Sequence, residues 1–191
     1  MKVIFLDFDG VITLPPKWHL ESDKIKLVKK IIDETEAKIV VSSSWRHGLE
    51  RHFAHVLEKD PNNEMIIWLR DNILDITPNV GLGNGRGGEI QQWLNDHREV
   101  TNYVILDDDC DMWDSQLFHF VQTNYEYGLT ESEITYAIKI LNGLYIYNLL
   151  GLNFEIRERW VKKCDGNEQL WENTIKYNDL IQDFHKQYTI K

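Results

Sequence analysis

The sequence is poor in cysteine, has no excess of basic residues and contains no long apolar run. Cys110 and Cys164 are the only cysteines among its 191 residues, too few for a disulfide framework or a cysteine-rich zinc site. The longest nearly apolar stretch, residues 141–154, is interrupted by Asn142 and Asn148 and is too short to span a bilayer. The acidic N-terminal segment does not have the pattern of a signal peptide. We therefore expect a reduced, cytoplasmic protein without a membrane partner.

Acidic residues outnumber basic ones, 31 to 21, which gives a formal net charge of −10. This balance excludes a protein whose whole surface is a basic nucleic-acid clamp, although it allows a local basic pocket. Hydrophobic residues make up 42% of the chain and charged residues 27%, proportions that indicate a globular rather than a disordered or fibrous protein.

Short apolar runs alternate with amphipathic stretches, and no repeat, low-complexity tract or linker divides the chain. The apolar runs predict buried strands at residues 2–6, 38–41, 73–76, 103–106 and 117–122. The amphipathic stretches predict helices at residues 22–36, 45–59, 88–96 and 130–150. Strands that alternate with helices predict an α/β fold, a Rossmann-like, doubly wound parallel sheet flanked by helices.

Local signals mark two of the predicted helix starts. Ser22 is the expected N-cap of the first helix, and Thr130 with Glu133 predicts a capping box for the last one. From residue 155 onward the pattern is less regular and predicts an amphipathic terminal helix. We therefore expect a domain over residues 1–154 that carries the chemistry, and a helical appendage over residues 155–191 that packs on it.

Acids and hydroxyls follow three of the predicted strands. Asp7 and Asp9 come after the first strand, the serines at 42–44 after the second, and the acids at 107–109 after the strand at 103–106. Right-handed crossovers place the carboxyl ends of parallel strands on one edge of the sheet, where open α/β sheets bind ligands. We therefore expect these groups to meet in one crevice.

The segment DFDGV, residues 7–11, predicts a site for a divalent cation. Two carboxylates after an apolar strand are costly unless they are compensated, and Mg²⁺ prefers such oxygen ligands. Gly10 permits the sharp turn that leaves both acids at the crevice. An ordinary Asx turn is the alternative. The second acidic cluster, ILDDDCD at residues 105–111, favours a shared cation over a merely solvated loop.

Two further segments are candidates for binding a phosphate group. SSSWR, residues 42–46, places hydroxyls and backbone N–H groups at a helix start, although the serines alternatively only cap that helix. The sequence leaves open whether Ser42 or Ser43 points inward. Arg86 precedes a predicted helix, from which its guanidinium can reach a phosphoryl oxygen; the alternative is a surface arginine.

A competing motif is GxGxxG at Gly83, Gly85 and Gly88, which imitates a dinucleotide-binding fingerprint. The tight strand-to-helix turn that this motif requires is missing, because Pro78 and further residues separate the weak predicted strand at 73–76 from the glycines. The chain contains neither a Walker motif nor paired metal-binding histidines.

The order DFDGV, SSSW, Arg86 and LDDD resembles the four motifs of the haloacid dehalogenase (HAD) superfamily of phosphotransferases, over about residues 1–145. The strings SSSWR, ITP (76–78), RGGEIQQWL (86–94) and YVILDDDCDM (103–112) are more narrowly similar to the HAD domain associated with RNA-repair proteins. The resemblance implies that Asp7 is a nucleophile that forms an aspartyl-phosphate, and that Asp9 is its general acid and base.

The resemblance also implies the ligands. Mg²⁺ would be held by Asp7, the carbonyl of Asp9 and Asp108, with Asp107 assisting, and Asp111 is an alternative in this register. Ser42, or Ser43 in its place, would hold the phosphoryl oxygens together with Arg86 as charge shifts in the transition state.

Spacing predicts an open site with a minimal cap or none, because only about a dozen residues separate Gly10 from the first helix. We expect a Mg²⁺-dependent phosphomonoester hydrolase acting on a phosphorylated small molecule or on a nucleic-acid end. A phosphotransferase and a non-catalytic module that binds a phosphorylated ligand are the alternatives. The candidate substrate rim consists of Arg46 and His47, with Lys17, Arg51 and Arg86 as further cations and Trp18 and Trp45 as stacking candidates.

Overall fold

A parallel sheet of five strands runs through the residues described by this computed structural model, 1–81 and 85–143. The strands are β1 (Lys2–Leu6), β2 (Lys38–Val41), β3 (Ile73–Ile76), β4 (Asn102–Asp107) and β5 (Phe120–Gln122). The helices are α1 (Ser22–Thr35), α2 (Leu49–Lys59), α3 (Glu64–Asn72), α4 (Gly85–Asp96) and α5 (Glu131–Leu141), with 3₁₀ segments η1 (Ser44–Arg46) and η2 (Asp114–His119). None of the helices described is long and apolar enough to cross a membrane.

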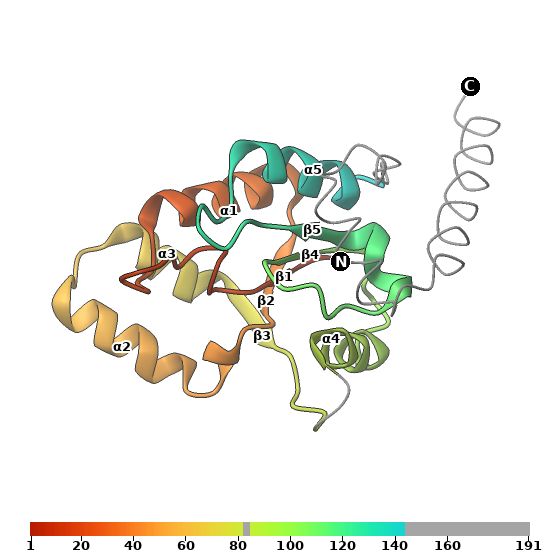
Figure 1. The fold of residues 1–191 in the computed structure, drawn as a ribbon, viewed down its shortest axis with the longest axis horizontal. Coiled ribbons are helices and arrows are strands. Elements are labelled where there is room, and N and C mark those ends of the chain that lie inside the picture. The colour runs from red at the N-terminus through yellow and green to blue at the C-terminus, as the bar shows by residue number, and fades with distance from the viewer. Residues whose placement is uncertain (82–84, 144–191) are drawn as a thin grey trace. The chain divides into compact units, whose positions relative to one another are not determined.

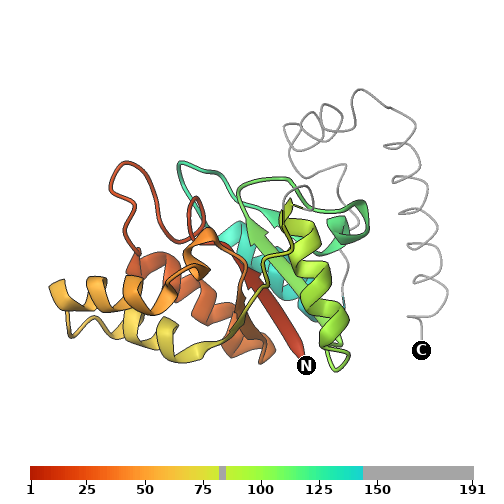
Figure 2. The same cartoon turned by 90° about the horizontal axis from the view of Figure 1, so that it is seen from below.

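The strand order β3-β2-β1-β4-β5 places β1 at the centre of the sheet, as Figure 1 shows. Leu6 of β1 lies beside Val41 of β2 and Leu106 of β4. The chain runs outward from β1 to β3 and then returns through α4 to β4, so the strand order reverses between β1 and β4. Open α/β sheets bind ligands outside the carboxyl ends of the strands at such a reversal. Figure 2 shows the loops that follow the strands gathered at one edge, away from the N-terminus.

Helices cover both faces of the sheet, with α1 and α5 on one side and α4 on the other (Figure 1). Val3 and Phe5 of β1 pack with Ile90 and Trp93 of α4 in one buried cluster, and the rings of Phe5 and Trp93 meet edge to face at 5.4 Å. Each fully buried side chain of this size contributes roughly 1.5–3 kcal/mol, so the central strand is firmly anchored. The acids that follow it are therefore held on a rigid support.

The predicted Rossmann-like sheet is confirmed, and the differences are local. The predicted helix at 45–59 is divided into η1 and α2 because Gly48 adopts a φ of +102°. The prediction of Ser22 as an N-cap is wrong: Glu21 holds that position, and the Ser22 hydroxyl donates to Asn63. The capping box of Thr130 and Glu133 is present.

Further differences concern where elements begin and end. The strand predicted at 117–122 covers only 120–122, since the preceding residues belong to η2, and α4 begins at residue 85 rather than 88. Helix α3 was not predicted. The last part of the helix predicted at 130–150 and the appendage predicted at 155–191 lie outside the described residues.

Candidate active site

Three carboxylates gather where β1 and β4 end. Asp7 follows β1, Asp107 is the last residue of β4, and Asp108 comes next. Because the two strands are parallel neighbours, the backbone N–H of Asp7 donates to the carbonyl of Leu106 at 2.9 Å. One carboxylate oxygen from each of the three acids lies within 4.8 Å of the others. The sheet register therefore produces the crevice that the strand ends predict.

Burial and mutual repulsion perturb these acids. Burial, followed by the charge of Asp7, raises the pKa of Asp107 well above its usual range. Burial raises the pKa of Asp7 as well, although nearby Arg86 opposes this shift. Burial and Asp7 raise the pKa of Asp108 to about 6. A cation shared by the three carboxylates would relieve this cost.

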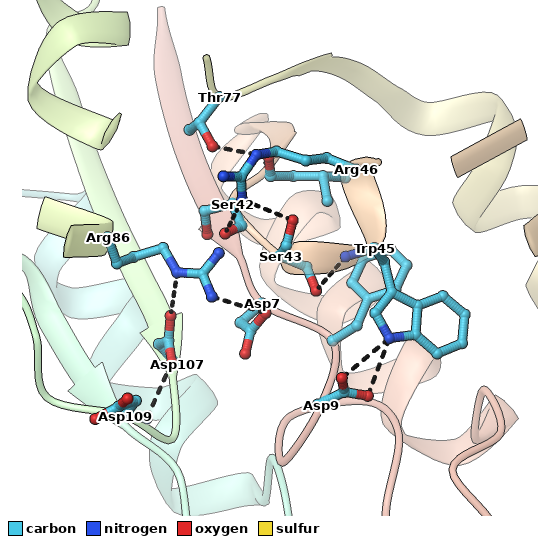
Figure 3. A network of polar contacts seen from close by, with 12 residues as sticks. Asp7, Asp9, Ser42, Ser43, Trp45, Arg46, Thr77, Arg86, Asp107 and Asp109 are labelled. Carbon is cyan, nitrogen blue, oxygen red and sulfur yellow. Dashed lines mark hydrogen bonds and ion pairs between the residues drawn. The ribbon is translucent and has the colours of Figure 1, made fainter. Parts of the chain in front are cut away.

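Arg86 reaches the acids from the first turn of α4, as Figure 3 shows. Its Nε lies 3.2 Å from Oδ2 of Asp107 and its Nη2 lies 3.6 Å from Oδ1 of Asp7. Burial lowers the pKa of Arg86, but the surrounding carboxylates, Asp107 first, outweigh burial, so the net shift of this pKa is upward. Within the described part of the chain, its buried Nη1 has no hydrogen-bond partner.

A glycine in the first turn of α4 allows this helix to pack closely against the segment that contains Trp113 and Gln116. A Cβ on Gly87 would lie 2.6 Å from the backbone nitrogen of Trp113 and 2.7 Å from Oε1 of Gln116. The carboxylate of Asp111 accepts from the backbone N–H of Arg86 at 2.8 Å and so serves the helix start. It does not belong to the group of three acids. Strand β3 ends at Ile76, well before α4 begins, so the tight turn of a dinucleotide fingerprint is not formed.

Gly10 lies directly beside the acids. Its φ is +71°, and a Cβ there would lie 2.7 Å from Oδ2 of Asp108. Only glycine combines this conformation with such an approach, which supports the role expected from the sequence.

Ser42 and Ser43, the first two of the three serines that follow β2, are fully buried. The Ser43 hydroxyl accepts from the backbone N–H of Trp45 at 3.2 Å, and its hydrogen bond to Asp7 lowers the pKa of that acid. The Ser42 hydroxyl has no partner among the described residues. Figure 3 shows both serines on the side of Asp7 from which Arg86 also approaches.

Asp9 points elsewhere. Its carboxylate accepts from the indole N–H of Trp45, at 3.0 and 3.1 Å, and from the Thr13 hydroxyl at 2.6 Å. It is not one of the three clustered acids. Trp45 packs against Phe8 and His52 with ring centroids 5.5 and 4.8 Å away, so it is a packed side chain rather than an open stacking surface.

The structure does not place Arg46 on an exposed rim. The arginine is 9% exposed, forms an ion pair with Glu89 of α4, and donates from Nη1 to the carbonyls of Ser42 and Ser43 at 3.3 and 2.9 Å. Glu89 was not anticipated, because nothing local in the sequence marks it as the partner of Arg46. His47 is exposed and lines, beside Arg46, a cleft of about 410 Å³ toward β3 and α4.

A parallel sheet in the order described, with acids after its first and fourth strands and a basic residue brought in by α4, defines a HAD-type domain. The family model for the HAD domain in Swiss Army Knife RNA repair proteins matches residues 3–134. The chain belongs to this family. Comparison with curated proteins and with solved structures gives no match.

Proposed function

We propose that this domain is a phosphomonoester hydrolase that transfers the phosphoryl group to Asp7. The observation that carries the proposal is the pair of buried donors beside Asp7, the Ser42 hydroxyl and Nη1 of Arg86, which have no partner among the described residues. Buried polar groups are ordinarily satisfied, and the oxygens of a phosphoryl group would satisfy both. The pattern is therefore that of an anion site built beside a carboxylate.

The proposed reaction assigns Asp7 and Asp9 the roles that the family resemblance implies, and gives the phosphate-binding role to the unpartnered buried donors. An oxygen of Asp7 attacks phosphorus, the bond from phosphorus to the leaving oxygen breaks, and Asp9 gives that oxygen a proton. Asp9 then takes a proton from water, whose oxygen attacks phosphorus and releases inorganic phosphate from Asp7. Arg86 and the buried serines stabilise the charge on the phosphoryl oxygens throughout.

The donor set fits Mg²⁺. Asp7, Asp107 and Asp108 offer three hard oxygen ligands within 4.8 Å of one another, and the backbone carbonyl of Asp9 is a further candidate ligand. The bound cation would cancel the repulsion between Asp7 and an anionic substrate. Arg86 supplies the second positive charge at the same place.

The substrate class we favour is a nucleotide or a polynucleotide end. The family description names RNA repair proteins, which supports a nucleic-acid substrate. The loop between Asp9 and α1 is short, which supports access for a large substrate.

Phosphate release from p-nitrophenyl phosphate and from oligonucleotides with 3′- or 5′-terminal phosphates tests the proposal, with Mg²⁺ and with a chelator. We expect Mg²⁺-dependent turnover that Asp7→Asn abolishes. The matched control is Asp33→Asn, which removes the same charge from the exposed face of α1. Turnover by Asp7→Asn at the wild-type rate contradicts the proposal. Binding without turnover would instead indicate a non-catalytic module, and transfer to an added alcohol would indicate a phosphotransferase.

A further inference from the structure

Exposed aromatic side chains gather on the loops around the candidate site. The large hydrophobic residues exposed in the described part of the chain are Trp18, Leu74, Ile76, Trp113, Tyr125 and Tyr127. The two aliphatic ones lie on the edge strand β3, where exposure is ordinary. All four aromatic ones lie on loops that follow β1, β4 and β5. These loops are at the carboxyl edge of the sheet, which also carries the three acids (Figure 2).

The loops after β1 and β5 are joined to the acids and to each other. Thr123 begins the loop after β5; its N–H donates to the carbonyl of Asp107 at 3.0 Å and its hydroxyl donates to the carbonyl of Gly10 at 2.8 Å. Gln122 donates to the carbonyl of Asp108 at 2.7 Å. Further along, the N–H of Leu129 donates to the carbonyl of Val11 at 3.0 Å. Both loops therefore start at the carboxylate cluster.

Trp18 and Tyr125 meet where these two loops lie side by side. Their ring centroids are 5.3 Å apart with an interplanar angle of 60°, and the side chains remain 37% and 50% exposed. The loop that holds Trp18 closes back on its start, because Thr13 pairs with both Asp9 and Leu20. The Lys24 ammonium fixes the other loop by donating to the carbonyl of Tyr127 at 2.6 Å. Loops that are fixed by hydrogen bonds therefore hold the aromatic pair at the solvent-exposed surface.

We propose that Trp18 and Tyr125 form a stacking subsite for the bases of a single-stranded polynucleotide whose terminal phosphate enters the Asp7 site. This inference rests on the proposed function and specifies its substrate. Exposed aromatic faces on loops that start at a phosphate site suit nucleobases, since every base has a face that can stack on them. Positive charge on these loops is sparse: Lys17, beside Trp18, is exposed, whereas Lys24 donates to the carbonyl of Tyr127 and His19 lies 3.1 Å from Glu21. Binding should therefore combine stacking with at most one lysine contact to the backbone, and salt should weaken it only modestly.

The test compares base-bearing and base-free substrates. Wild type, Trp18→Ala, Tyr125→Ala and the ring-preserving Trp18→Phe are assayed with a terminally phosphorylated oligoadenylate, the same backbone with abasic residues, a phosphopeptide and p-nitrophenyl phosphate. We expect the alanine variants to lower kcat/KM for the oligoadenylate, relative to p-nitrophenyl phosphate, by roughly tenfold. Trp18→Phe retains most of the preference. Leu74→Ala removes an equally exposed side chain on β3 and is the control.

Equal turnover of base-bearing and abasic substrates by the wild type overturns the subsite, as does an unchanged ratio in both alanine variants. A preference for the phosphopeptide that Trp18→Ala removes would assign the surface to peptides and would also overturn it. If the wild type hydrolyses none of these substrates, the proposed function fails separately. Fluorescence anisotropy of the labelled oligoadenylate and its abasic counterpart, with the same variants, then decides the subsite by itself.

Discussion

The indole N–H of Trp45 donates to both carboxylate oxygens of Asp9, at 3.0 and 3.1 Å. The two residues come from different strand ends, since Trp45 lies in η1 after β2 and Asp9 follows β1. Thr13 donates to the same carboxylate at 2.6 Å. In the proposed reaction Asp9 handles the proton of the leaving oxygen, so these two donors set the orientation from which it does so.

Replacing Trp45 with phenylalanine should therefore slow substrates with poor leaving groups most. An alkyl phosphate needs a proton on its leaving oxygen, whereas p-nitrophenol leaves readily without one. We expect kcat/KM, which reports the step in which the leaving oxygen departs, to fall roughly ten- to a hundredfold for an alkyl phosphate, with a much smaller loss for p-nitrophenyl phosphate. Rates for a series of leaving groups measure this difference.

Two controls accompany this variant. Thr13→Val removes the other donor to Asp9, the Thr13 hydroxyl, and should act in the same direction. A thermal melt of Trp45→Phe separates the effect on Asp9 from lost packing against Phe8. An equal loss of kcat/KM for all leaving groups would mean that Trp45 does not act through proton transfer to the leaving oxygen.

Arg46 and Glu89 provide a prediction on stability. Their side chains are only 7% and 14% exposed, and they join η1 to the helix that carries Arg86. Arg46→Met leaves Glu89 buried without its cation, which should cost about 3–5 kcal/mol in the free energy of unfolding. The double variant Arg46→Met/Glu89→Met should recover much of this loss. Urea unfolding measures both.

The exposed pair of Lys30 and Glu131, 2.9 Å apart with side chains 47% and 69% exposed, is the matched control. Lys30→Met should cost less than about 1 kcal/mol, because solvent screens an exposed ion pair. If Arg46→Met costs no more than Lys30→Met, the buried pair does not hold η1 and α4 together.

The parts of the site that could be predicted from the sequence are those with a local signature. Asp7 and Asp107 each follow a buried apolar run, and the parallel sheet then brings the two strand ends together. The role of Arg46 had no such signature, since its partner Glu89 is 43 residues away and an arginine after serines equally suits the surface. Helix α3 escaped detection because its apolar residues, 65–69, are consecutive and lack helical spacing.

Gly10 should tolerate no side chain. Gly10→Ala adds a Cβ that would lie 2.7 Å from Oδ2 of Asp108, in a backbone conformation with φ of +71°. We expect a loss of more than about 2 kcal/mol in unfolding free energy and weaker stabilisation by Mg²⁺, because the carboxylate must move.

Gly81 is the matched control for this variant. It has a similar φ of +83°, but none of the described residues has an atom within 4 Å of a Cβ built there. Gly81→Ala should therefore show only the backbone cost of about 1–2 kcal/mol and an unchanged response to Mg²⁺. Equal losses for the two variants would show that the contact with Asp108 is unimportant.

The raised pKa of Asp108 predicts how pH and Mg²⁺ together affect the free energy of unfolding. Burial and Asp7 raise its pKa from 3.8 to about 6 in the folded, metal-free chain. Between these values the folded state holds more protons than the unfolded state, so this group makes stability fall as pH rises from about 4 to about 6. Above that range the ionised carboxylate destabilises the metal-free fold, and a bound cation offsets the repulsion.

Urea unfolding over this pH range, with Mg²⁺ and with a chelator, measures the effect. Asp108→Asn should make the metal-free protein more stable than wild type above about pH 6, and it should lose most of the stabilisation by Mg²⁺. Asp33→Asn, which removes the same charge from an exposed i,i+4 pair on α1, should change neither property. Stabilisation by Mg²⁺ that persists in Asp108→Asn at the wild-type level would remove this carboxylate from the metal site.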